Sequence, residues 1–185
     1  MENNQTKGAY MNKEKGKLLC FDLVLLIVLV MIDRVTKQIA VIKLKDQPAF
    51  NIIDGVLEFN YLENRGAAFG MLQNQKVFFV FVALVFLSVI LYVLFKTPDQ
   101  RKYFKLHVLL TLIAAGAIGN MIDRLKFDYV VDFIYFVLIN FPVFNVADIY
   151  VTLATAILII NVLFVYKDND FNFLSFKQNK IREIK

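Results

Sequence analysis

Four stretches of the chain are long and apolar enough to cross a membrane. They run from Leu18 to about Lys37, from Val77 to Phe95, from Leu106 to about Ile122, and from Val146 to Tyr166. Each approaches the ~20 residues that an α-helix needs to cross ~30 Å of hydrocarbon. Backbone groups in lipid must bond within their own segment, so these stretches are predicted to be helices. The pattern therefore predicts an all-α integral membrane protein, with four transmembrane helices in a single membrane domain covering residues 1–185.

Two connections, about 41–76 and 123–145, then lie on the same side of the membrane. In the first, β-prone runs flank Asp54-Gly55, which predicts a hairpin and a small extracytoplasmic β-sheet. The second is rich in phenylalanine and tyrosine, as is typical of a segment at the membrane interface. We expect it to lie along the surface.

Charge sets the predicted orientation. Lysine and arginine number 13 on the side of the two termini and 8 on the side of the two long connections. By the positive-inside rule both termini face the cytoplasm. The net charge of +5 thus reflects membrane topology, and the 58% hydrophobic content indicates helices in lipid. The basic residues form no stripe that would bind nucleic acid.

Polar residues gather at one membrane face. Asp33 lies ~22 Å along the first helix, Asn120 lies ~21 Å along the third, and Asp148 lies ~3 Å into the descending fourth. These three positions therefore reach the same level. Intramembrane and interfacial ionisable groups are costly enough to indicate function.

Other polar residues reach the same layer from neighbouring positions or connections. Asp123 and Arg124 share a helix face with Asn120, and Asn145 shares one with Asp148, while the connections bring further groups. These are Asn64, Gly66 and Asp132.

Structural explanations compete for several of these residues. The pattern from Asn145 to Asp148 is also that of a helix cap, and Asp123 with Arg124 could form an interfacial ion pair. The segment Gly66–Gly70 fits either helix packing or a close backbone approach to a ligand. Cys20 is predicted to be a buried thiol, Asp22 a structural residue and His107 an interface residue.

Two carboxylates facing one water can hydrolyse an amide, one as general base and the other as proton donor. Asp132 and Asp148 are the preferred pair, because neither has a cation beside it in sequence, whereas Asp33 and Asp123 do. Zinc and serine mechanisms are disfavoured: the chain has one histidine, and Ser88 and Ser175 lack a suitable base. A transporter would need charged groups at the middle of the membrane and helices broken there, whereas these polar groups lie at one end of the helices. An inactive scaffold that binds lipoprotein precursors is a further alternative.

Five segments resemble the motifs of bacterial lipoprotein signal peptidase, or signal peptidase II. They are Asp33-Arg34-Val35-Thr36-Lys37, Asn64–Gly70, Gly119–Arg124, Val130–Phe133 and Phe144–Asp148. Their order and spacing make the resemblance specific over residues 18–166. Three positions depart from the residues common in that family: Arg34, Tyr135 and Ile149. These departures affect fine substrate contacts, and both Asp132 and Asp148 are still present.

The resemblance implies an aspartic endopeptidase of the bacterial inner membrane, with Asp132 and Asp148 as its catalytic pair and no metal or other cofactor. Its substrate is a prolipoprotein, cut just before the diacylglyceryl-modified cysteine, and its inhibitor is globomycin. Other matching positions are expected to bind substrate or support the pair, with Asp33 and Asp123 in structural roles and Lys37 less clearly assigned. The supporting positions are Asn64, Gly66, Asn120, Arg124 and Asn145. A monomer suffices for every role.

Overall fold

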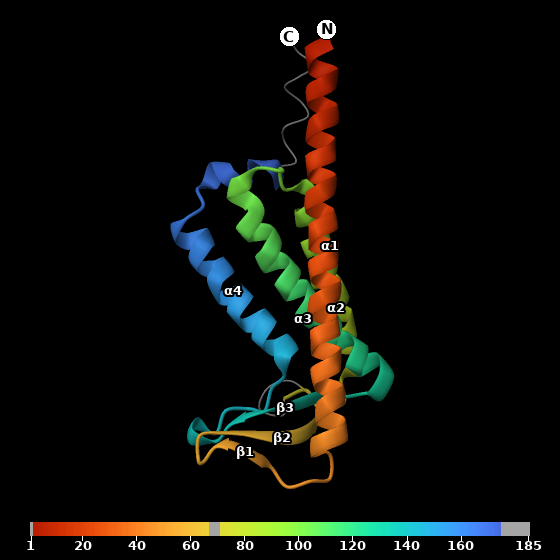
Figure 1. Cartoon of the computed structure of the whole chain (residues 1–185), viewed down its shortest axis with the longest axis vertical. Coiled ribbons are helices and arrows are strands. Elements are labelled where there is room, and N and C mark those ends of the chain that lie inside the picture. The colour runs from red at the N-terminus through yellow and green to blue at the C-terminus, as the bar shows by residue number, and fades with distance from the viewer. Residues whose placement is uncertain (1, 67–70, 175–185) are drawn as a thin grey trace.

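Four long helices and one small sheet make up the molecule. The computed structural model describes residues 2–66 and 71–174, with side chains from residue 13 onward. The helices are α1 (Glu2–Leu44), α2 (Lys76–Lys96), α3 (Phe104–Phe127) and α4 (Val146–Phe164). The strands are β1 (Phe50–Ile53), β2 (Leu57–Asn64) and β3 (Val130–Phe136). The sheet lies at one end of the bundle, and the start of α1 lies at the other (Figure 1).

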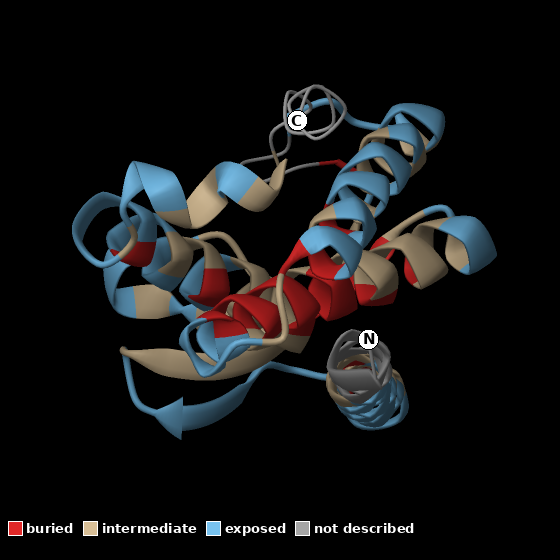
Figure 2. Ribbon diagram, turned by 90° about the horizontal axis from the view of Figure 1, so that it is seen from above, coloured by how far each residue is buried: buried red, intermediate tan, exposed pale blue. Residues whose placement is uncertain are grey.

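Helix α3 lies at the centre and carries more buried positions than any other element (Figure 2). It packs against each of the other three helices. A Cβ atom on Gly116 would lie 2.4 Å from the carbonyl oxygen of Ala147, and one on Gly119 would lie 2.5 Å from Oδ2 of Asp33. The small residues of α3 thus let α4 and α1 approach its backbone, at the end of the bundle that adjoins the sheet.

The sheet has the order β1-β2-β3 with both pairs antiparallel. Its first turn contains Gly55 at φ 71°, a left-handed conformation that suits glycine. The predicted hairpin is therefore confirmed. In the second pair, Asn64 lies opposite Val130 and Leu62 lies opposite Asp132, which brings the end of β2 beside the start of β3.

Among the described residues, three helices are long and apolar enough to cross a membrane: α2, the segment Arg101–Phe127, and α4. Much of the surface of α2 and α4 consists of exposed large apolar side chains, as a lipid-facing surface requires. Helix α1 is not among the three. Its apolar stretch contains Asp22, Asp33, Arg34 and Lys37, all but Arg34 buried.

The structure corrects several expectations from the sequence. The second connection also contains the end of α3, to Phe127, and β3, which pairs with β2; the sequence predicted neither of these. Helix α1 extends well beyond residues 18–37 at both ends. Cys20, predicted to be buried, is exposed. The described residues also form three short 3₁₀ segments, at Arg101–Tyr103 (η2), Val137–Ile139 (η3) and Asp168–Leu174 (η4).

Candidate active site

A cavity of about 680 Å³ opens where the sheet meets α3 and α4. Its polar lining comes from four elements and from the residues after β2, and most of the remaining wall is apolar. The polar groups with candidate roles are Asn64, Gly66, Asn120, Arg124, Asp132 and Asp148. Residues far apart in the sequence thus converge on one concave site, as substrate sites commonly require.

Asp132 is the most enclosed acid of this cavity, with 1% of its surface exposed. Its Oδ2 accepts a hydrogen bond from Asn64 Nδ2 at 2.8 Å, and its Oδ1 accepts one from Asn145 Nδ2 at 2.6 Å. Burial, together with the charge of Asp148, raises the pKa of Asp132 to about 7. The two amide donors oppose this shift without cancelling it. Asp132 can therefore carry a proton near neutral pH.

Asp148 lies in the first turn of α4 and is partly exposed. Its Oδ1 accepts from Asn120 Nδ2 at 2.7 Å, and its Oδ2 accepts from the backbone N–H of Asn145 at 3.1 Å. The N–H of Asp148 in turn donates to Asn145 Oδ1, which completes a capping box at the start of the helix. The capping explanation is thus correct, and it coexists with a place in the cavity. The cap fixes the orientation of the carboxylate.

Asn145 joins the two acids. Its side-chain nitrogen donates to Asp132 and, at 3.2 Å, to Asn120 Oδ1, while its backbone N–H donates to Asp148. The residue is fully buried, so these bonds are not in competition with solvent. One residue thereby holds both carboxylates in a fixed relation.

An ionic cluster supports the cavity from behind. Lys37 Nζ lies 3.0 Å from Oδ2 of both Asp33 and Asp123, and all three side chains are fully buried. The same Nζ donates to Asn120 Oδ1 at 2.8 Å, which directs the amide nitrogen of Asn120 toward Asp148. A buried charge is tolerated only when it is paired, and here one cation serves two acids. Sequence reasoning left Lys37 unassigned, although its i, i+4 spacing from Asp33 was a usable signal.

The two acids of this cluster also tie separate elements together. Asp33 Oδ1 accepts from the N–H of Ala147 at the start of α4, at 3.2 Å. Asp123 accepts from the N–H of Val131 in β3, at 3.2 Å, and forms an ion pair with Arg34. Of the alternatives left open by the sequence, an ion pair of Asp123 is observed, but with Arg34 and Lys37 rather than Arg124. Asp33 and Asp123 thus position β3 and α4, the elements that carry Asp132 and Asp148.

Arg124 contacts the backbone of Gly66 at the rim of the cavity. Its Nη2 donates to the carbonyl oxygen of Gly66 at 3.0 Å, and its guanidinium lies over the ring of Phe79, 4.5 Å from the centroid. The N–H of Gly66 donates to Asn64 Oδ1. A Cβ atom on Gly66 would lie 2.4 Å from the carbonyl oxygen of Met71, so this position requires glycine. The rest of Gly66–Gly70 lies outside the described residues.

The family model described as signal peptidase (SPase) II matches residues 25–164 of the chain. The chain belongs to the signal peptidase II family. It is 38% identical over 153 residues to the lipoprotein signal peptidase of Clostridium tetani, covering 81% of this chain and 95% of that protein. It is 43% identical over 145 residues to the lipoprotein signal peptidase of Symbiobacterium thermophilum, covering 77% and 94%. The predicted resemblance is confirmed.

Solved structures show a similar fold. Two structures of a bacterial membrane enzyme superpose with TM-scores of 0.69 and 0.70, at 30% and 31% identity. They cover 77% and 79% of this chain, and 87% and 94% of the solved chains. The fold of the chain is therefore similar to that of a solved bacterial membrane enzyme.

The structure brings all nine candidates of this signal peptidase II chain into one region. Six line the cavity, Asn145 bonds to both acids, and Asp33 and Asp123 stand behind. Of the three positions that depart from common family residues, Ile149 lines the cavity, Arg34 pairs with Asp123, and Tyr135 donates to Asn140. Among the described residues, no group of three or more His, Cys, Asp or Glu is placed to hold a metal ion.

Proposed function

We propose that this chain is an aspartic endopeptidase that removes the signal peptide of a lipoprotein precursor immediately before its diacylglyceryl-modified cysteine. One observation carries the proposal: Asp132 and Asp148, from different elements, line a single cavity and both bond to Asn145. Two carboxyl groups with unlike surroundings can divide the roles of acid and base.

The unequal burial of the pair supports a division of roles. Asp148 is partly exposed, and we propose that it is the base that takes a proton from the attacking water. The hydroxyl oxygen bonds to the scissile carbonyl carbon, and Asp132 gives its proton to the carbonyl oxygen. When the intermediate collapses, the C–N bond breaks and Asp148 returns its proton to the leaving nitrogen. Asp132 recovers a proton from the diol, which restores the starting state.

The supporting residues divide into two groups by their contacts. Asn64, Asn120 and Asn145 donate to the carboxylates and so hold them in position. Gly66 and Arg124 form the rim, where the backbone of Gly66 holds one side of the guanidinium and its remaining N–H groups can donate to an extended substrate. Asp33 and Asp123 hold the elements that carry the pair.

The apolar wall of the cavity fits a lipid-bearing substrate. Side chains of the sheet and of the segment after it cover one side, next to the two acids. These are Leu57, Ile134, Phe136, Phe141 and Phe144. Lipid tails are as apolar as these side chains, so the diacylglyceryl chains can contact the wall without leaving an apolar environment while the cysteine lies beside the pair. We expect globomycin to compete for this cavity.

The membrane arrangement follows from the same proposal. Helix α1 supplies the fourth span, because its charged residues are buried against α3 rather than turned to lipid. Both termini face the cytoplasm and the sheet faces the extracytoplasmic side of the bacterial inner membrane. The active site then lies at the level of the outer leaflet. A monomer contains every group that the mechanism uses.

Cleavage of a diacylglyceryl-modified precursor by the purified protein in detergent tests the proposal. We expect the wild type to cut before the modified cysteine and globomycin to inhibit it. Asp132→Asn and Asp148→Asn should each lose activity by at least a thousandfold while unfolding at nearly the same temperature. Asp54→Asn, at the exposed hairpin turn, is the matched control. Full activity in either dyad variant would refute the assignment.

A further inference from the structure

Arg124 lines the active-site cavity and has no acidic partner among the residues that the structure describes. Its guanidinium carries several N–H donors, and one of its nitrogens, Nη2, donates to the carbonyl oxygen of Gly66 at 3.0 Å. Arg34, in the same layer of the molecule, instead forms an ion pair with Asp123. Arg124 therefore keeps a charge that no bonded carboxylate neutralises, and its other N–H groups are available to a substrate.

The ring of Phe79 also holds this guanidinium. Cζ of Arg124 lies over the ring, 4.5 Å from its centroid. The face of an aromatic ring carries partial negative charge, so it attracts a cation placed over it. A carboxylate in the same place would bond to two N–H groups and neutralise the charge, whereas a phenyl ring has no lone pair to take them up. An aromatic partner therefore restrains Arg124 and leaves its donors available.

The first turn of α2 places this ring beside α3. Phe79 lies in that turn, where its N–H donates to the carbonyl oxygen of Gln75 at 3.1 Å. Lys76, at the start of the same turn, forms an ion pair with Asp128 at 2.6 Å and donates to the carbonyl oxygen of Leu125 at 3.4 Å. Both contacts attach the start of α2 to the end of α3. Phe79 is thus carried on a helix start that is already attached to the helix of Arg124.

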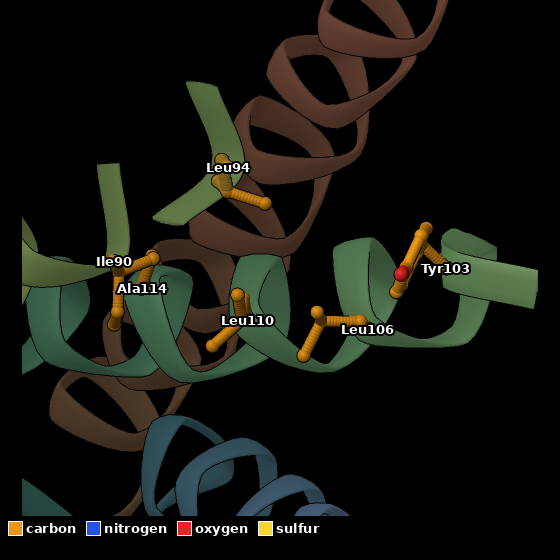
Figure 3. Packing of buried hydrophobic residues seen from close by; sticks show 6 residues of the cluster. All are labelled: Ile90, Leu94, Tyr103, Leu106, Leu110 and Ala114. Atoms are coloured by element: carbon orange, nitrogen blue, oxygen red, sulfur yellow. The ribbon is translucent and has the colours of Figure 1, made fainter. Parts of the chain in front are cut away.

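A separate apolar cluster holds the later turns of α2 against α3 (Figure 3). Its buried members are Ile90, Leu94, Tyr103, Leu106, Leu110 and Ala114. Phe79 lies 11 residues before Ile90, ~16 Å along the helix, and belongs neither to this cluster nor to the partly buried residues packed on it. The packing of α2 therefore does not depend on Phe79, so the effect of a change in this ring can be attributed to its contact with Arg124.

We propose that Phe79 is a positioning residue for substrate binding, which acts through Arg124. Its ring and the carbonyl oxygen of Gly66 together hold the guanidinium at the cavity rim, so its remaining N–H groups are in place before the substrate arrives. An arginine side chain loses rotamer freedom when it binds, and holding it in place beforehand reduces that cost. The inference rests on the proposed function, in which Arg124 donates to an extended substrate.

Stepwise fluorination of the ring at position 79 tests the functional part of the proposal. Mono-, di- and trifluorinated phenylalanines withdraw negative charge from the ring face and keep its shape, so a purely apolar packing role would not respond. We expect kcat/KM for a lipidated precursor to fall with each step, by about fivefold for the trifluorinated ring. The same series at Phe86, an exposed residue of α2, is the matched control and should leave kcat/KM unchanged. An unchanged kcat/KM across the series at position 79 would overturn the proposal.

NMR of the arginine Nε–H groups tests the ring contact without any need for catalysis. The chain has five arginines, and the Arg124 signal is assigned by its loss in Arg124→Lys. The ring current of Phe79 should shift this signal upfield, Phe79→Leu should abolish the shift, and Phe86→Leu should leave it in place. Absence of precursor cleavage by the wild type would refute the proposed function. An Arg124 signal that Phe79→Leu leaves unmoved in an active enzyme would refute this inference alone.

Discussion

Single residues in this molecule acquire their properties from what surrounds them. Asp132 and Asp148 have the same side chain, yet one is buried in the sheet and the other is partly exposed at a helix start. Burial penalises a charged carboxylate, whereas exposure lets water solvate it. The difference between the two acids therefore lies in their positions, and the pH dependence of the reaction should reveal it.

The first prediction concerns that pH dependence. Asp132 must be protonated to donate, and its pKa is raised to about 7, so kcat/KM should fall as pH rises through that value. The hydrogen bond from Asn64 favours the ionised form. Asn64→Ala should therefore raise the pKa of Asp132 further and move the alkaline limb to higher pH. Asn51→Ala, exposed on β1, should leave the limb in place.

The pH–rate profile of lipidated-precursor cleavage measures both variants against the wild type. Because interacting acids titrate together, the midpoint belongs to the pair rather than to one residue. A limb that shifts to lower pH in Asn64→Ala would contradict the donor role given to Asn64.

The second prediction concerns Lys37. Lys37→Met leaves Asp33 and Asp123 buried without the cation between them, and breaking a buried pair in this way costs about 3–5 kcal/mol. Thermal or denaturant unfolding in detergent measures the loss. The control Lys45→Met removes an exposed pair with Glu63, which is worth about 1 kcal/mol or less. Similar losses in the two variants would show that the cluster contributes no more than a surface pair.

Helix α3 organises the other elements because its small residues allow close contact. Ala147 and Val151 of α4 lie against Gly116, and the start of α4 carries both Asn145 and Asp148. A change in the distance between the two helices therefore moves half of the catalytic pair. Packing density at this contact links the fold directly to the geometry of the site.

The third prediction uses Gly116→Ala. The added Cβ meets the carbonyl oxygen of Ala147 at 2.4 Å, so the two helices must shift apart, at a cost of about 1–3 kcal/mol. We expect kcat to fall by about tenfold or more, because small misplacements of reacting groups are costly. Gly16→Ala on α1 meets nothing within 4 Å and should be neutral or slightly stabilising. Unchanged kcat in Gly116→Ala would show that the distance between α3 and α4 does not control catalysis.

Polar groups within the molecule lie in two layers. One lies near the sheet and holds the pair of acids, and the other, with Asp22 and His107, lies toward the opposite end. Beyond the second layer, η4 is attached to η2 through the ion pair of Lys102 with Asp170 and the hydrogen bond from Tyr103 to Asp170. The sheet and η4 lie at opposite ends of the bundle (Figure 1).

The fourth prediction tests the topology of the whole chain. In a Cys20→Ser background, single cysteines replace Lys13, Asp54 or Gln100, all of them exposed. A membrane-impermeant maleimide should label Asp54→Cys in intact spheroplasts, and should label Lys13→Cys and Gln100→Cys only after permeabilisation. Labelling of Lys13→Cys in intact spheroplasts would show that α1 does not cross the membrane and would leave three spans.

The sequence by itself determined the helices, the hairpin and the candidate residues. Long apolar runs require helices in lipid, and the β-prone runs around Asp54-Gly55 specify their own turn, so both follow from local chemistry. The candidate residues were found because they occur at matching depths and in five ordered motifs.

Only the tertiary structure decided which polar groups meet. The pairing of β3 with β2, the engagement of Asp123 by Lys37 and Arg34, and the burial of His107 against Asp22 all join segments that are distant in sequence. Such contacts depend on how helices rotate and pack, which local patterns leave open. The same holds for the unequal burial of Asp132 and Asp148, because burial is a property of the assembled fold.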